Sequence, residues 1–290
     1  SLGEMTHAGI PVPPGFVITA HAFEEFLHET KLYAEIEAAL DKVNYEDVNS
    51  VDKASNIIHD LIHYARVPKD IEEEIMRHHT ALGAAYVAVR SSATAEDSST
   101  ASWAGELETY LNTTTKNLIG NIKKCWASLY TPRAIVYRNE KGMRKSHVSV
   151  AVVIQTMVQS EVAGVAFTVH PVTRDKNHMI IEACWGLGEL LVGGSVTPDS
   201  YIVDKRDGTL LEVNIHTQEQ GLFRTPKGNA LKKIPTKQQE QQKLDSAQIR
   251  QLAYLCKTIE THYGFPCDIE WGMISGEFYI LQYRPITTLG

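Results

Sequence analysis

Hydrophobic residues recur at helical spacing through much of the N-terminal half of the chain. Residues 32–40, 51–65, 68–76 and 116–130 have this spacing. So do two shorter stretches, one directly after Thr19 and one that begins at Pro132. Thr19 stands where a helix N-cap is expected, and Pro132 stands where proline is favoured in a first helical turn. The pattern predicts a set of amphipathic helices that act mostly as scaffold.

Short apolar runs with β-branched residues indicate strands that interrupt and follow these helices. The predicted strands are 86–90, 148–157, 164–169, 179–184, 200–204 and 210–215. Residues 217–243 are polar and rich in Lys and Gln, so we interpret them as an exposed excursion. A long amphipathic helix at 245–263 then leads into a hairpin that ends the chain.

Composition narrows the class of protein further. The 290 residues are 43% hydrophobic, which can supply a sizeable core, and the formal net charge of -7 excludes a global cationic surface for nucleic acid or anionic lipid. The four cysteines lack any metal-binding spacing and are expected to be reduced thiols. No apolar stretch approaches membrane-span length, and no signal pattern opens the chain. We expect a cytoplasmic, soluble protein with no nucleic-acid or membrane partner.

The terminal hairpin, CDIEWGM-ISG-EFYILQYR, carries the clearest chemical signal. Alternate side chains of a strand share a face, so Asp268 and Glu270 lie together, as do Gln282 and Arg284. A turn at 275–276 would make these two pairs cross-strand neighbours. Carboxylate and amide oxygens suit Mg²⁺, and Arg suits phosphate, which predicts a metal–nucleotide site. A half-exposed hairpin in which Arg284 merely pairs with Glu270 explains the same residues.

Two further stretches have the composition of ligand-binding loops. The first, VAVRSSATAEDSSTASWAGELET, places Arg90 at a strand end before a loop rich in Ser and Thr, although it lacks a Walker motif. A plain polar connection is the alternative. The second, GLGELLVGG, lacks the Rossmann spacing, and its glycines are better explained by a turn where two backbones approach closely.

Several of these motifs together resemble one known family. The collinear stretches are SLGEMTHAGIPVPPGFVIT, VAVRSSATAED, ASWAGELETYLN, CWASLYTPRAIVYR, GVAFTVHPVTRD, WGLGE, TPDSYIVD and DIEW with YILQYRPIT. They span essentially the whole chain and are similar to the N-terminal ATP-binding domain of phosphoenolpyruvate synthases, pyruvate phosphate dikinases and rifampin phosphotransferases. The resemblance implies an α+β, ATP-grasp-like fold in which two mixed α/β subdomains clamp a nucleotide. We expect them at 1–155, with the phosphate-binding loop, and at 156–290, with the terminal hairpin.

The resemblance also assigns roles to residues in the first subdomain. Arg90 falls on the family's phosphate-contacting arginine. Gly105 and Thr109 fall on the loop that folds over the nucleotide, and Gln155 falls on the hinge strand that borders the adenine. ATP and Mg²⁺ are the implied ligands.

In the second subdomain the family likeness agrees with the reading of the hairpin. Glu270 and Gln282 match the metal-coordinating pair, and Arg284 matches a second phosphate-binding arginine. Asp268 is the nearby acidic residue of the same ribbon. The expected metal ligands are therefore Glu270 and Gln282.

The family places its phosphoryl-accepting histidine and its final substrate in further domains, and a phosphate-contacting lysine in a stretch before SLGEM. We therefore expect no catalytic acceptor within this chain, which would be part of a longer enzyme and would partner a phosphohistidine domain and a substrate domain in cis or in trans. The favoured activity is that of a phosphoenolpyruvate synthase. An antibiotic kinase similar to the rifampin phosphotransferases and a stand-alone nucleotide-binding module are the alternatives.

Overall fold

The structure is a computed structural model, and it describes residues 2–93, 108–142, 149–226 and 228–286. The chain forms two compact units, one of Pro14–Met157 and one of Ser1–Pro13 with Val158–Gly290. We call the first the helix-rich unit and the second the sheet-rich unit. Both contain helices and β-sheets, so the fold is mixed α/β. None of the helices in the described ranges is long and apolar enough to cross a membrane.

The helix-rich unit contains most of the helices that hydrophobic spacing predicts. Its helices are α2 (Ala20–Glu29), α3 (Leu32–Leu40), α4 (Val48–Tyr64), α5 (Lys69–Leu82), α6 (Leu118–Ala127) and α7 (Pro132–Glu140), with 3₁₀ turns η1 (Thr115–Asn117) and η2 (Ser128–Tyr130). Thr131 caps α7, because its side chain accepts a hydrogen bond from the Ala134 N–H. Thr19 stands at the N-cap of α2 but makes no such bond, so the expected side-chain cap is wrong there.

These helices pack against a four-stranded sheet. Its strands are β1 (Gly15–Ile18), β2 (Val87–Ala93), β3 (Thr109–Thr113) and β4 (Val150–Thr156), in the order β1-β4-β2-β3, with antiparallel pairing throughout. Val87, Val89, Val152 and Ile154 belong to the same buried cluster as the helix residues. Alternation therefore turns residues 88, 90, 153 and 155 to the other face of the sheet.

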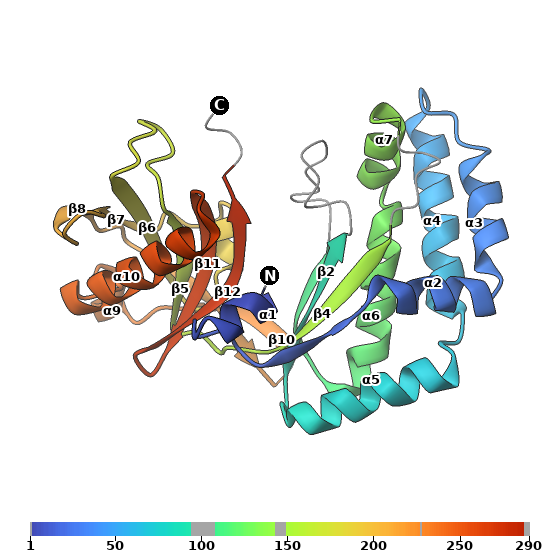
Figure 1. Ribbon diagram of the computed structural model, residues 1–290, viewed down its shortest axis with the longest axis horizontal. Helices are drawn as coiled ribbons and strands as arrows, with labels where there is room; N and C mark the ends of the chain where they lie inside the picture. Colours follow the sequence, from blue (N-terminus) through green and yellow to red (C-terminus); the bar gives the residue numbers. More distant parts are fainter. Residues whose placement is uncertain (1, 94–107, 143–148, 227, 287–290) are drawn as a thin grey trace. The chain divides into compact units, whose positions relative to one another are not determined.

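The sheet-rich unit is built on a six-stranded antiparallel sheet of order β12-β11-β5-β6-β7-β8. The strands are β5 (Val162–Phe167), β6 (His178–Trp185), β7 (Asp199–Asp204), β8 (Leu210–Asn214), β11 (Cys267–Ile274) and β12 (Glu277–Pro285). Helix α10 (Ser246–Tyr263) crosses one face of this sheet (Figure 1). Ile249, Leu252 and Cys256 of α10 are buried in one cluster with Ile269 and Trp271 of β11.

The first residues of the chain pack in the sheet-rich unit, which differs from the expected division at 155. Helix α1 (Leu2–His7) buries Met5, and Ile10 follows it into the core of this unit. The Ile280 N–H also donates to the Pro11 carbonyl at 2.8 Å. Burial of two apolar side chains and a backbone hydrogen bond hold this segment next to β12, although the two are distant in sequence.

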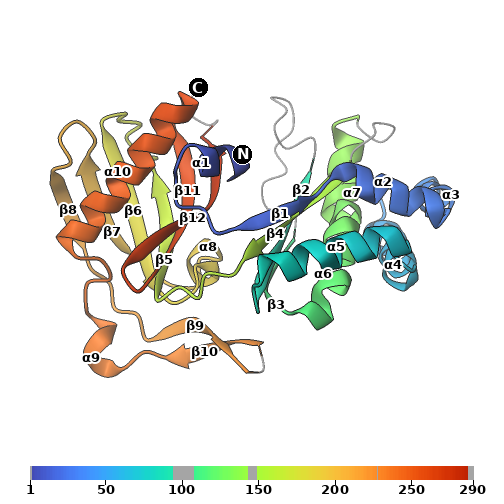
Figure 2. The ribbon, with the colours of Figure 1, turned by 60° about the horizontal axis from the view of Figure 1, so that its bottom comes forward.

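Residues 217–243 are mostly exposed, as predicted, and they form a regular structure that is anchored to the sheet at its base. They contain the hairpin of β9 (Gln220–Thr225) and β10 (Gly228–Lys233) and the short helix α9 (Thr236–Gln239), and the hairpin projects from the sheet (Figure 2). Its base is fixed at both ends. The Gln218 side chain bonds both the N–H and the carbonyl of Trp185, and Lys243 forms an ion pair with Asp199 at 2.7 Å.

The glycine-rich turn after β6 is a close approach of two backbones, as its sequence predicts. Gly186 adopts a φ of +86°, and a Cβ there would lie 2.5 Å from the Leu222 carbonyl oxygen. The Leu187 N–H donates to that same oxygen at 2.9 Å. A side chain at Gly186 is therefore excluded both by the left-handed backbone and by the contact with β9.

Candidate functional site

The two polar pairs of the terminal ribbon are cross-strand neighbours, as the sequence predicts, although a bulge between Glu270 and Trp271 that strand alternation did not predict brings them into register. Strands β11 and β12 are joined by a two-residue turn, in which Ser275 and Gly276 both have positive φ. Asp268 lies directly opposite Arg284, and Glu270 lies directly opposite Gln282. Directly opposed residues share a face, so two carboxylates, an amide and a guanidinium line one side of the ribbon. The side chains of Ile269 and Trp271 occupy the other side, inside the core.

Arg284 lies between the two carboxylates. Its Nη2 atom is 3.4 Å from Oδ2 of Asp268 and 3.5 Å from Oε1 of Glu270. These contacts are long for charge-assisted hydrogen bonds, and the Oδ1 atom of Asp268 is buried with no hydrogen-bond partner. Burial raises the pKa of Asp268, while Arg284 acts in the opposite direction. The contact between Arg284 and Glu270 that the alternative interpretation requires is thus observed. It leaves the oxygen atoms of Asp268 without their full set of hydrogen bonds.

The helix-rich unit brings a second group of predicted residues together. Arg90 of β2 lies opposite Thr109 of β3 and opposite Val153 of β4. Gln155 lies opposite Ala88, so it is a diagonal neighbour of Arg90 at about 7–8 Å between Cα atoms. Arg90, Thr109 and Gln155 therefore share the face of the sheet opposite the one that packs on the helices. Gly105, the fourth predicted residue of this group, lies outside the described residues.

Gln155 is the least satisfied polar side chain of this group. It is 3% exposed, and its amide nitrogen Nε2 has no hydrogen-bond partner. A buried amide donor without an acceptor costs free energy, so its presence directly after the apolar residues 150–154 of β4 calls for an explanation. A ring nitrogen or carbonyl oxygen of a ligand would satisfy it.

Glu182 is a candidate residue that sequence reasoning did not single out. It lies on β6 opposite Val165, and Val165 lies opposite Glu270, so the three side chains form one row on one face of the sheet. The Cα atoms of the two glutamates are about 10 Å apart, two strand spacings. Burial raises the pKa of Glu182. The available signal was a single charged residue inside the apolar strand MIIEACW.

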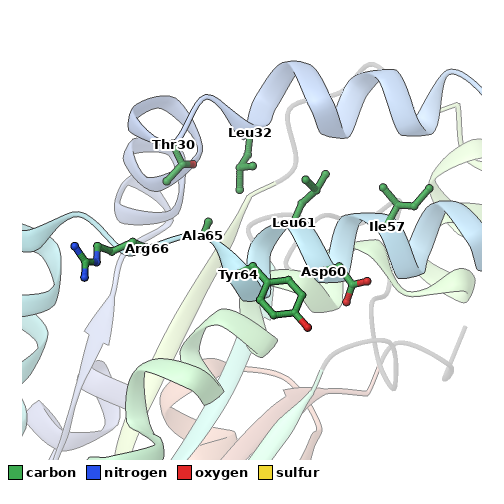
Figure 3. Close-up of a pocket in the computed structure, with 8 residues that line it drawn as sticks. All are labelled: Thr30, Leu32, Ile57, Asp60, Leu61, Tyr64, Ala65 and Arg66. Atoms are coloured by element: carbon green, nitrogen blue, oxygen red, sulfur yellow. The ribbon is translucent and has the colours of Figure 1, made fainter.

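A groove on the surface of the helix-rich unit contains none of the predicted site residues. It has a volume of about 670 Å³ and lies between the α2–α3 junction and the end of α4 (Figure 3). The lining side chains include Leu32, Ile57 and Leu61, with Asp60 and Arg66 as charged neighbours. Because the groove is formed by scaffold helices, it adds nothing to the nucleotide site that the sequence predicts.

Metal binding at the ribbon would require help from a ligand. In the described parts of the chain, no group of three or more His, Cys, Asp or Glu residues is placed to hold a metal ion. Mg²⁺ commonly takes one or two carboxylates and completes its shell with water and phosphate oxygens. The carboxylate of Glu270 and the amide of Gln282 offer oxygen ligands of this kind, and the guanidinium of Arg284 can bind a phosphate group.

Comparison with known proteins identifies the family. Residues 1–290 match the family described as "Pyruvate phosphate dikinase, AMP/ATP-binding domain". The chain belongs to this family, and it is an ATP-binding domain of the phosphoenolpyruvate synthase and pyruvate phosphate dikinase type.

Individual relatives agree with this assignment. The chain is 43% identical to a probable phosphoenolpyruvate synthase of Methanothermobacter thermautotrophicus, covering 100% of this chain and 43% of the relative. It is 39% identical to the phosphoenolpyruvate synthase of Pyrococcus furiosus, covering 100% and 41% respectively. It is also 39% identical to a rifampicin phosphotransferase of Bacillus cereus, covering 100% and 34%. The chain thus spans less than half of each of these relatives.

A solved structure, the D-alanine–D-alanine ligase of Helicobacter pylori, aligns with 99% of this chain and 52% of its own. The sequence identity is 13% and the TM-score is 0.33, a value too low to support an argument about the fold.

Proposed function

We propose that this chain binds Mg-ATP and donates a phosphoryl group to a histidine on a separate domain, in an enzyme that converts pyruvate to phosphoenolpyruvate. ATP would be cleaved to AMP and phosphate in the course of the reaction. The fold behind this proposal is ATP-grasp-like, with a nucleotide clamped between two subdomains. The observation that carries it is the ribbon face, where Glu270 opposes Gln282 and Asp268 opposes Arg284.

The side chains present fit a magnesium–nucleotide ligand. Glu270 and Gln282 offer hard oxygen atoms from adjacent strands, and both are part-buried. Arg284 offers a planar guanidinium whose present contacts, at 3.4 and 3.5 Å, are long enough to be exchanged for a phosphate. The unpaired amide of Gln155 fits the edge of an adenine ring.

Bound ATP supplies the phosphoryl group, and the chain supplies position and charge. Phosphoryl transfer depends mainly on alignment and on neutralising charge that spreads over the phosphate oxygens. Glu270 and Gln282 would hold the metal, while Arg90 and Arg284 would contact the phosphates. Thr109, which begins β3, would contact the nucleotide, and Gly105 keeps the nucleotide-binding role that the family resemblance implies. The acceptor histidine belongs, in this proposal, to a phosphohistidine domain outside this chain.

A second candidate function is the phosphorylation of a rifamycin antibiotic. It is favoured by the identity of 39% to the rifampicin phosphotransferase, which equals the identity to the Pyrococcus furiosus synthase. The two candidates share the nucleotide site and differ in the final acceptor. To separate the two candidates, the full-length gene product is incubated with Mg-ATP and either pyruvate or rifampin, and the AMP released is measured. AMP release with pyruvate alone supports the synthase, and release with rifampin alone supports the antibiotic kinase.

The role of the ribbon is tested by calorimetry on Glu270→Ala. We expect this variant to lose at least about tenfold in affinity for Mg-ATP, because a metal ligand is removed, and to lose much less for ATP in the presence of EDTA. Glu277→Ala, at the exposed turn end of the same hairpin, is the matched control and should bind as the parent chain does. Equal losses with and without Mg²⁺ would contradict a metal role for Glu270.

A further inference from the structure

Strand β8 forms an outer edge of the six-stranded sheet. It pairs with β7 on one side, and on its other side no strand of the described ranges is hydrogen-bonded to it. Both ribbon views place β8 at the limit of the sheet (Figures 1 and 2). Every second residue of such a strand directs its N–H and carbonyl groups outward, where they can pair with another strand.

This edge has no lysine or proline, two residue types that commonly prevent strand pairing at an edge. Edge strands are commonly protected by lysine, proline or charged side chains that point inward. Residues 209–217 read TLLEVNIHT, without lysine or proline. Leu211, Val213 and Ile215 are 49%, 39% and 46% exposed, although each is a strongly apolar, strand-forming residue. The pairing with β7 has one bulge, at Leu211, and it is regular from Glu212 to Asn214.

The sequence of this edge is self-complementary when it is paired with itself in the antiparallel direction. With Val213 opposite Val213 of the partner subunit, Leu211 stands opposite the partner's Ile215. In the same register Glu212 stands opposite the partner's Asn214, a carboxylate against an amide donor. Thr209 likewise meets the partner's Thr217. Leu210 meets the partner's His216, and this is the one pair of the register that is not matched in chemistry.

We propose that the outer edge of β8 is an interaction surface for a second copy of this chain, paired antiparallel with Val213 on the two-fold axis. Because this two-fold axis is perpendicular to the sheet, helix α10 lies on the same face of the joined sheet in both copies. The two six-stranded sheets then continue as one sheet across the pair. The edge hydrogen-bonding groups of both copies become satisfied.

The neighbouring symmetric registers are less favourable. An axis at Glu212 would place two carboxylates directly opposite each other, which is destabilising. An axis at Asn214 would place Leu211 opposite the partner's Thr217, an apolar side chain against a polar one.

A contact limited to one strand per copy is small. Stable interfaces generally bury more than about 1,000 Å² in total, and smaller ones are weak. We therefore expect a dimer that forms at high protein concentration and dissociates on dilution.

Disulfide trapping tests the register directly. All four natural cysteines are buried, so Val213→Cys introduces an exposed thiol. Opposed residues of antiparallel strands have Cα atoms about 4.5–5.5 Å apart, within the range a disulfide bridges. Under mild oxidation the 290-residue Val213→Cys chain should become mostly disulfide-linked dimer. Leu231→Cys, 57% exposed on β10, is the matched control and should remain mostly monomeric.

Sedimentation of the unmodified chain and of a charged variant supplies the second measurement. Val213→Lys places two like charges at the axis and should raise the dimer dissociation constant by at least about fivefold, whereas Leu231→Lys should not change it. Circular dichroism confirms that each variant is folded. An unmodified chain that stays monomeric at every concentration, a dimer unaffected by Val213→Lys, or equal cross-linking of the two cysteine variants would each overturn the proposal.

Discussion

Glu270 and Gln282 are directly opposite each other on adjacent antiparallel strands, twelve positions apart in the sequence and one strand spacing apart in space. The two-residue turn at Ser275 and Gly276 alone would place Glu270 opposite Leu281, and a bulge between Glu270 and Trp271 shifts the register so that Glu270 meets Gln282. Arg284 and Asp268 occupy the next opposed positions along the same face. The donor set that we assign to Mg-ATP therefore depends on one hairpin.

Arg90→Lys tests whether the guanidinium of Arg90 makes a bidentate contact with phosphate. The substitution keeps the positive charge but removes the planar fork, so we expect ATP affinity to fall by more than about 1 kcal/mol in calorimetry. Parallel titrations with adenosine should show no change, because adenosine lacks phosphates. Unchanged ATP affinity would show that Arg90 has a structural role.

Gln155→Met tests the unpaired buried amide. Because Nε2 already lacks a partner, its removal should change the free energy of unfolding by less than about 1 kcal/mol. ATP affinity should fall by about tenfold, since a hydrogen bond to the adenine would be lost. Urea unfolding and calorimetry on the same preparation separate the two effects. A loss of stability without a loss of affinity would contradict the assignment.

Glu182→Gln should stabilise the chain at neutral pH. Burial raises the pKa of Glu182 in the folded state, so its ionised form is disfavoured there at pH 7. The neutral variant removes that cost and should raise the melting temperature by about 2–4 °C, the shift for about 1 kcal/mol in a chain of this size. This gain in melting temperature should shrink as the pH falls through the pKa of Glu182 in the folded state. It should vanish below about pH 4.3, where the Glu182 carboxyl is protonated in both the folded and the unfolded state.

Thermal unfolding between pH 4 and pH 7 checks this prediction for Glu182. Glu277→Gln, at an exposed position of β12, is the control and should leave the melting temperature unchanged across the range. A gain that is constant with pH would mean that the variant acts through packing and not through the charge of Glu182.

Lys243→Met should destabilise the sheet-rich unit strongly. Lys243 and Asp199 are both fully buried as side chains, and Lys243 Nζ lies 2.7 Å from Asp199 Oδ1. Removing the ammonium leaves a buried carboxylate without its counter-charge, which typically costs about 3–5 kcal/mol. Asp199 would still accept hydrogen bonds from Tyr201 and from the His216 N–H.

Urea denaturation measures that loss. Lys69→Met removes an ion pair with Glu73 in which Lys69 is 89% exposed, so it is the matched control and should have little effect. Adding Asp199→Asn to Lys243→Met should recover part of the stability, because the unpaired charge disappears. A loss below about 1 kcal/mol for the single variant would contradict a buried ion pair.

Local patterns predicted the parts of the fold that depend on local physics. The helix at 32–40, the place of Pro132 in a first helical turn and the shared polar face of the terminal hairpin follow from hydrophobic spacing, proline preference and strand alternation, which act over a few residues. The site roles of Arg90, Thr109, Gln155 and the ribbon residues came from family resemblance, and they stay predictions until the variants are measured.

The sequence by itself determined the elements, the family motifs and the polar face of the ribbon. Only the tertiary structure decided that Ile10 packs beside β12, that Asp199 pairs with Lys243, and that Glu182 shares a row with Glu270. Each of these contacts joins segments far apart along the chain. The spatial order of the strands in each sheet is set by burial of the whole core and by the hydrogen bonding of its polar groups. No short stretch of sequence contains that information.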